Sequence, residues 1–444
     1  MSFTSPVFLF AFLPLTVIVY QLARSTKIKN IVWIAAGLLF YAFGDVRHLP
    51  LLLGSCLLHY GAGRYLMAQK KARRAVLLSC VALDLAVLAF YKVRGALPLG
   101  ISFYTFQAIS YVADTYKNPA DGTKNLRETL QYLTFFPQLT AGPFLKFSAL
   151  RPYLDRRETT WEKNAQGVRR FVCGLCKKVL LSTAAAKLAD AMFSLASIDA
   201  LGAWTGALGY CLQLYFDFSG YSDMALGLGL LFGVQLPENF RHPYCAGSVT
   251  EFWRRWHMTL SGWFRDYVYI PLGGSRKGRA RTVFNKLLVF LATGLWHGTG
   301  WTFVLWGLWH GAFCGAETLL DRNKTLKTHW YGHVYTLLVV IFGFVLFRAE
   351  SLPQALMLLR TMLSGFTPVD ACRLALRNLL TVRTAVWCFV GVLACLPVWE
   401  HAKARFDGSR WFSPALDALT IVGLLLCLMQ LASHSFQPFI YASF

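Results

Sequence analysis

The feature that most constrains this chain is the recurrence of long apolar stretches from one end to the other. Four of them open the sequence, at about 6–22, 30–44, 49–67 and 75–91. Stretches of this length suit helices that cross the hydrocarbon core of a bilayer. Hydrophobic residues make up 56% of the 444 residues, which is too many for an ordinary soluble protein and indicates a polytopic helical membrane protein. The alternating strands of a transmembrane barrel are not evident.

The rest of the chain repeats this pattern less regularly. Residues 100–147 are apolar but short-segmented, with Pro137, Gly142 and Pro143 in FFPQLTAGPF, and we expect broken or re-entrant structure there. Further apolar segments lie at about 203–234, 283–296, 301–320, 333–348, 354–364, 379–398 and 414–432. We therefore predict an all-α membrane domain over 1–444, with roughly ten to twelve membrane-embedded helices. No long linker divides it.

The net charge of +22 is carried by short basic segments between the apolar runs. The basic loops at 24–29 and 70–74 are two crossings apart, so they face the same side of the membrane. The positive-inside rule places both in the cytoplasm and the N-terminus outside. The N-terminal stretch lacks a basic region and a cleavage site, so we expect a retained helix. Such basic loops lie beside anionic lipid more often than they bind nucleic acid, and we expect a multi-pass membrane protein.

The eleven cysteines suggest neither a disulfide framework nor a metal site. Cys173 and Cys176 form a CxxC pair, but no second pair stands at zinc-ligand spacing. We interpret the two as small packing residues and expect no bound metal.

The densest polar cluster is EFWRRWHMTLSGWFRDYVYIPLGGSRKGRAR at 251–281. One interpretation is an amphipathic interfacial helix whose basic side chains reach lipid headgroups. The other is a cytoplasmic lip that attracts an anionic ligand. The Gly273-Gly274 turn before Arg276 and Lys277 is compatible with a phosphate cradle, although a Gly-Gly turn is a weak signal.

Two carboxylates stand in the apolar stretch just upstream. Asp217 and Asp223 lie in YFDFSGYSDMALG, and carboxylates at membrane depth are costly unless they are paired or hydrated. Arg241 and His242 are possible partners. We expect a structural role, with a helix break at Gly220.

The tetrapeptide LWHG occurs twice, and each copy places a histidine in an apolar stretch. His297 and His310 are 13 residues apart, which on a straight helix gives about 20 Å of rise and nearly opposite faces. Gly298 and Gly300 make a straight helix doubtful, but they too favour separate roles. A neutral buried imidazole suits general-base chemistry, so one of the two histidines is a candidate for it.

Several motifs, taken together and in order, resemble the membrane-bound O-acyltransferase family, in its bacterial branch that O-acetylates polysaccharides such as alginate and peptidoglycan. They are ISFYTFQAISYVADTYK, FFPQLTAGPFLKF, YFDFSGYSDMALG, PENFRHPY, TEFWRRWHMTLSGWFRDYVYIPLGG and the first LWHG. The resemblance implies helices around a central funnel, with N-terminal helices at 1–95, core motifs at 96–311 and C-terminal helices at 312–444. It also implies that His297 is the catalytic histidine and His257 the second one, whereas His310, outside the usual catalytic position, remains a packing residue.

The resemblance further implies transfer of an acetyl group from a cytoplasmic thioester, with acetyl-CoA as the donor and no permanently bound cofactor. Arg254, Arg255, Arg276 and Lys277 would attract its phosphates. The acceptor would be an extracytoplasmic polysaccharide, reached through a hydrolase-like acetyltransferase partner, since this chain has no G-x-S-x-G elbow of its own. The alternatives are D-alanyl transfer from a carrier protein, a transporter without thioester chemistry, and a scaffold that recruits an extracytoplasmic enzyme.

Overall fold

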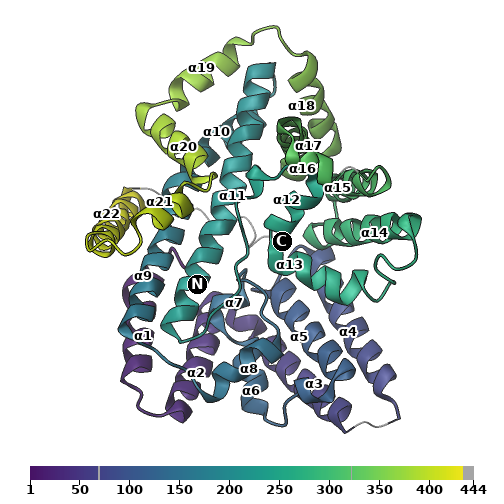
Figure 1. The fold of residues 1–444 in the computed structure, drawn as a ribbon, viewed down its shortest axis with the longest axis vertical. Coiled ribbons are helices and arrows are strands. Elements are labelled where there is room, and N and C mark those ends of the chain that lie inside the picture. The colour runs from purple at the N-terminus through teal and green to yellow at the C-terminus, as the bar shows by residue number, and fades with distance from the viewer. Residues whose placement is uncertain (69–70, 322, 434–444) are drawn as a thin grey trace. The chain divides into compact units, whose positions relative to one another are not determined.

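The computed structural model describes residues 1–68, 71–321 and 323–433 (Figure 1). Every regular element in these residues is helical, which confirms the predicted all-α class. The chain forms two compact units. Unit 1 contains Met1–Gly174 and Tyr221–Glu238, and unit 2 contains Leu175–Gly220 and the described residues from Asn239 onward.

Unit 1 begins with the helices that the first four apolar stretches predicted. Its elements are η1 (Phe8–Phe12), α1 (Leu13–Leu22), α2 (Thr26–Asp45), η2 (Val46–His48), α3 (Leu49–Met67), α4 (Arg73–Arg94), α5 (Ile101–Lys117), η3 (Pro119–Asp121), α6 (Leu126–Leu133), α7 (Phe136–Leu139), α8 (Phe147–Asp155) and most of α9 (Trp161–Cys176). The short helices between 119 and 155 confirm the broken structure expected around FFPQLTAGPF. Helices α3, α4 and α5 lie side by side in Figure 1.

Aromatic rings fill the interior of unit 1. Phe3 stacks on Tyr221 at 4.6 Å between ring centroids, and Phe40 packs against Phe136 at 5.4 Å. All four side chains are buried. Burial of large rings gives the largest apolar contribution per side chain, so this cluster holds the N-terminal segment against α2 and α7.

Four helical stretches in the described residues are long and apolar enough to cross a membrane, or five if a bent pair counts as one. They are Thr26–Met67, Arg73–Arg94, Trp330–Arg348 and Phe412–Ser433, and the bent pair is Asp370–Leu379 with Val382–Ala394. Inside two of them a buried pair joins α3 to α4, where His59 Nε2 lies 2.9 Å from Asp84 Oδ2. Membrane character is thus confirmed, while the expected ten to twelve embedded helices and the central funnel stay predictions.

Unit 2 contains the remaining elements. They are η4 (Lys177–Ser182), α10 (Thr183–Ser194), the first part of α11 (Ala200–Leu231), η5 (Pro243–Cys245), α12 (Val249–Arg255), α13 (Met258–Phe264), η6 (Arg265–Tyr269), α14 (Arg279–His297), α15 (Trp301–Leu319), α16 (Asn323–Thr328), α17 (Trp330–Arg348), α18 (Leu352–Ser364), α19 (Asp370–Leu379), α20 (Val382–Ala394), α21 (Val398–Phe406) and α22 (Phe412–Ser433).

Helices α14 and α15 form a closely packed hairpin, visible side by side in Figure 1. The chain leaves α14 at Gly298, which is fully extended, and re-enters a helix at Trp301. A Cβ at Gly307 would lie 2.5 Å from the carbonyl oxygen of Phe290, so only glycine permits this approach of the two backbones. The chain therefore reverses direction between the two LWHG copies.

Two local expectations were wrong. Helix α11 runs without interruption through Gly220, so the carboxylates on it mark no helix break. The stretch 251–281 is not one interfacial helix either. It divides into α12, α13, η6 and a turn, because the backbone reverses at His257, whose φ is 43°.

Candidate functional site

His257 stands at the junction of α12 and α13, and a neighbouring amide fixes its protonation pattern. Its ring is buried and packs edge-on against Phe218 at 4.5 Å. Its Nδ1 lies 3.0 Å from Asn239 Oδ1, which also accepts the Thr259 N–H at 3.2 Å. Because that oxygen can only accept, Nδ1 carries the proton and the lone pair of the neutral ring lies on Nε2. The arrangement leaves the imidazole with the basic atom that proton abstraction needs.

His297 is the last residue of α14 and is buried among aromatic rings. Its ring lies 4.8 Å from that of Trp296, 5.3 Å from Trp306 and 5.0 Å from Phe347, each close to edge-on. The helix ends here because Gly298 leaves the helical conformation, so the side chain stands at a helix terminus. An imidazole in these surroundings is largely shielded from bulk water.

The second LWHG histidine shares a neighbour with the first. The ring of His310, on α15, also packs against Trp306, at 5.3 Å. The straight-helix geometry that separated the two histidines is therefore wrong, since the hairpin places both imidazoles against one indole.

The N-terminus of α12 is held by carboxylates. Ser248 accepts the Glu251 N–H at 3.1 Å as the N-cap, and Glu251 accepts the N–H of the preceding Gly247 at 3.0 Å. Burial alone would raise the pKa of the Glu251 carboxyl, but the Gly247 N–H and the Arg255 guanidinium outweigh it and hold that pKa below its ordinary value. The cap fixes the direction of the helix that leads into His257.

A buried carboxylate from another helix completes this cap. Glu317, on α15, accepts the N–H groups of Val249 and Thr250 at 2.7 and 2.9 Å. Negative charge is favourable at a helix N-terminus, so Glu317 ties the segment containing His257 to the α14–α15 hairpin. Sequence reasoning missed both Glu317 and Asn239. A lone carboxylate in an apolar stretch was the available signal for the first.

The four basic residues proposed for donor binding differ in their surroundings. Arg254, Arg276 and Lys277 are exposed, the last two in the turn that contains Gly273 and Gly274. Arg255 donates to Glu251 at 2.7 Å, so part of its charge is already satisfied.

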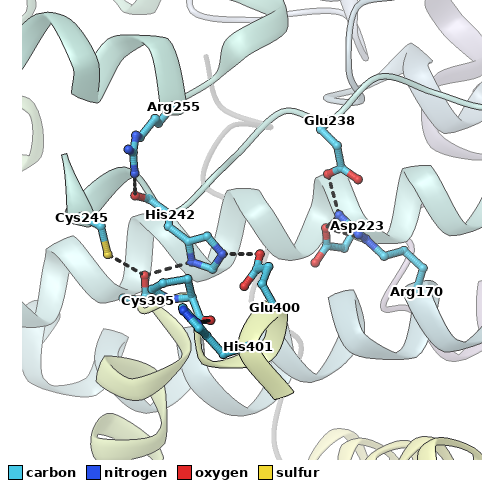
Figure 2. A network of polar contacts seen from close by, with 10 residues as sticks. Arg170, Asp223, Glu238, His242, Cys245, Arg255, Cys395, Glu400 and His401 are labelled. Atoms are coloured by element: carbon cyan, nitrogen blue, oxygen red, sulfur yellow. Dashed lines mark hydrogen bonds and ion pairs between the residues drawn. The ribbon is translucent and has the colours of Figure 1, made fainter. Parts of the chain in front are cut away.

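Figure 2 draws two polar networks, one in each unit. In unit 2, His242 lies with Nε2 2.5 Å from Glu400 Oε1 and Nδ1 3.2 Å from the carbonyl oxygen of Cys395. Both ring nitrogens therefore lie within hydrogen-bond distance of an oxygen. His242 also has a positive φ of 45°. The network fastens the RHPY segment to α21.

The network of Figure 2 in unit 1 contains Asp223, the second carboxylate of the YFDFSGYSDMALG motif. Arg170 donates to Asp223 at 2.7 Å and to Glu238 at 2.7 Å. In unit 2, Asp217 forms an ion pair with Lys178. These cations replace the partners suggested from sequence, because α9 and η4 bring them against α11, whereas His242 pairs with Glu400.

Comparison with known proteins agrees with the resemblance that these motifs indicated. Residues 118–358 match the membrane-bound O-acyltransferase family, and a probable alginate O-acetylase of Pseudomonas putida is 37% identical over the full length of both chains. The chain belongs to the membrane-bound O-acyltransferase family. A peptidoglycan O-acetyltransferase of Helicobacter pylori is 36% identical over 84% of this chain and 81% of its own length. A teichoic acid D-alanyltransferase of Bacillus subtilis is 28% identical over 57% of this chain and 69% of its own.

Membership of this family confirms that the chain is a membrane enzyme that transfers acyl groups. The matched range contains both candidate histidines and the basic residues discussed above. Among the described residues, no group of three or more histidine, cysteine, aspartate or glutamate side chains is arranged to hold a metal ion.

Proposed function

We propose that this acyltransferase moves an acetyl group from a cytoplasmic thioester, acetyl-CoA, to a hydroxyl group on the way to an extracytoplasmic polysaccharide such as alginate or peptidoglycan. The relatives with the highest identities reported above are named for these two polymers, which supports the choice of acetyl and of a glycan acceptor. The proposal places the protein in the bacterial inner membrane with its N-terminus outside. A hydrolase-like partner would complete the transfer to the polymer.

The observation that supports this proposal is the place of His297, a buried imidazole at the end of α14 that is enclosed by the rings of Trp296, Trp306 and Phe347. His297, at the end of α14, is the residue that activates the acceptor hydroxyl or carries the acetyl group itself. His257 is the second histidine of the site. Proton transfer by a positioned imidazole contributes about 10²- to 10⁴-fold to a rate.

The donor is proposed to bind through its phosphates. Arg254, Arg276 and Lys277 are exposed cations that raise the local concentration of an anionic substrate. Arg255 contributes less, since it is already paired with Glu251. Reversing the charge at Arg276 and Lys277 is therefore expected to raise the apparent KM for acetyl-CoA more than it lowers kcat.

The decisive experiment compares His297→Gln with a matched control, His401→Gln, which changes an exposed histidine on α21. Each variant replaces the wild-type gene in the host, and ester-linked acetate on surface glycans is measured by alkaline release, normalised to the enzyme in the membrane. We expect His297→Gln to abolish the ester and His401→Gln to keep it. Full ester content in His297→Gln would refute the chemistry and favour a scaffold.

A second measurement separates the alternatives. Inverted membrane vesicles that contain the enzyme are given acetyl-CoA, and the free CoA thiol is measured. A transporter would release none. The similarity to a D-alanyltransferase makes a carrier-protein thioester the alternative donor. If the vesicles consume only D-alanyl carrier protein, that thioester replaces acetyl-CoA as the proposed donor.

A further inference from the structure

His310 is a buried polar side chain that the proposed chemistry does not use. It is fully buried on α15, and its ring lies 4.9 Å from the ring of Trp253, 5.3 Å from Trp306 and 6.3 Å from Phe290. The ring can occupy this place only because residue 343, on α17, is glycine. A Cβ there would lie 2.4 Å from His310 Nε2.

The polar atoms of this cluster have no protein partner. Among the described residues, neither ring nitrogen of His310 has a hydrogen-bond partner, and the same holds for the buried indole nitrogens of Trp253 and Trp306. Leaving such a group buried and unpaired costs about 1–3 kcal/mol each. If the rings served only apolar packing, phenylalanine would fill the same space without that cost. We therefore interpret the unpaired ring nitrogens as groups that bind a ligand.

The chemistry of the cluster selects the kind of ligand. A neutral imidazole has one donor and one acceptor, and each indole has one donor and no acceptor. The three rings therefore offer three donors against one acceptor, and Trp253 and Trp306 are themselves 5.5 Å apart. Such a surplus of donors suits a ligand oxygen that only accepts, above all one that gains negative charge.

Trp306 connects this cluster to the proposed reaction centre, because its indole also packs against His297 at 5.3 Å. We infer that His310, Trp306 and Trp253 form a donor site for the carbonyl oxygen of the acyl group that is transferred at His297. This inference rests on the proposed function. It makes the second LWHG copy part of the catalytic apparatus, in a role distinct from that of the first.

The acceptor hydroxyl oxygen attacks the carbonyl carbon of the thioester while His297 takes the hydroxyl proton. The π electrons of the carbonyl move onto its oxygen, which the N–H groups of the cluster hold. When the carbonyl re-forms, the carbon–sulfur bond breaks and the thiolate takes the proton from His297. The three donor side chains neither gain nor lose a proton.

The test uses inverted membrane vesicles with the full-length enzyme, and measures the initial rate of CoA thiol release against acetyl-CoA concentration. His310→Phe and Trp306→Phe keep an aromatic ring but remove the donors, and we expect kcat to fall by about 10²- to 10³-fold with KM within about twofold. His310→Gln, which keeps a donor and an acceptor, should recover part of the rate. Phe290→Leu disturbs the same packing without removing a donor and should stay within about threefold of wild type.

A role in packing alone predicts the opposite result. If His310→Phe and Trp306→Phe both turn over within about threefold of wild type, the inference is overturned. If His310→Phe does not reach the membrane, Trp306→Phe and His310→Gln decide by the same criterion. Full activity in His297→Gln would instead refute the proposed function, whatever the activity of the His310 variants. If wild-type vesicles release no CoA, the same variants are compared by their glycan ester content in the host, with the same criteria.

Discussion

The buried ion pair between Lys178 and Asp217 gives the sharpest prediction of stability. Lys178 lies on η4 and Asp217 on α11, and their side chains are 10% and 0% exposed. Removing one partner takes the counter-ion from a charge that is buried away from water, and breaking a buried pair in this way costs about 3–5 kcal/mol. Replacing both partners by apolar residues of similar size is often neutral. Single and double variants should therefore behave in opposite ways.

We expect Lys178→Met and Asp217→Leu each to lower the free energy of unfolding by about 3–5 kcal/mol, and the double variant to recover most of that loss. At about 2 °C for each kcal/mol in a large domain, each single change lowers the unfolding midpoint by about 6–10 °C. The assay heats detergent-solubilised protein in steps and measures the monodisperse fraction by fluorescence-detected size exclusion.

A surface pair provides the matched control. Arg279 and Asp321 lie 3.4 Å apart with 65% and 80% of their side chains exposed, and exposed pairs contribute about 0–1 kcal/mol. Arg279→Met should thus leave the midpoint almost unchanged. If Lys178→Met is as stable as wild type, or if the double variant is less stable than both single ones, the reasoning from an uncompensated charge is refuted.

Three other contacts in unit 2 should also contribute to stability. Glu317→Gln keeps only one acceptor oxygen for the two N–H groups of α12, so the same heating assay should show a loss of about 1.5–3 kcal/mol, and wild-type stability would contradict the cap. Gly307→Ala places a Cβ 2.5 Å from a backbone oxygen of α14, whereas Gly262→Ala meets nothing within 4 Å, so only the first should lower the midpoint and the yield. The pKa of Glu400 would be raised by burial, but its bond to His242 outweighs this and holds it below the ordinary value of 4.5. A depressed carboxyl pKa stabilises above the unfolded value, so the advantage of wild type over Glu400→Gln should be present at pH 6 and be lost as the pH falls from about 4.5 through the lower pKa of the folded state. An advantage that stays undiminished down to the acid unfolding of the protein would exclude this linkage.

The apolar stretches were sufficient to predict the helices of unit 1 because each is amphipathic or apolar over its own length. The first four stretches correspond to η1–α1, α2, α3 and α4, and the prolines and glycine of FFPQLTAGPF marked the broken segment. Local patterns of this kind need no knowledge of distant residues.

The site could be predicted only in part. Motif resemblance identified His257 and His297, but the contacts that orient them come from residues far along the chain. Asn239 is 18 residues before His257, and Glu317 is 68 residues after the Val249 N–H that it caps. The pairing of Lys178 with Asp217 likewise depends on how η4 packs against α11. Hydrophobic periodicity does not encode such pairings. It also did not reveal the hairpin turn at Gly298, which brings His297 and His310 against the same indole.

The left-handed backbone at His242 and His257 carries a consequence for protein engineering. With φ of 45° and 43°, both residues adopt a conformation that favours glycine or asparagine and costs a side chain such as histidine about 1–2 kcal/mol. Glycine at either position would relieve this backbone cost. It would also remove the ring that holds α21 or the ring that Asn239 orients, so a choice based on backbone conformation alone would mislead the engineer.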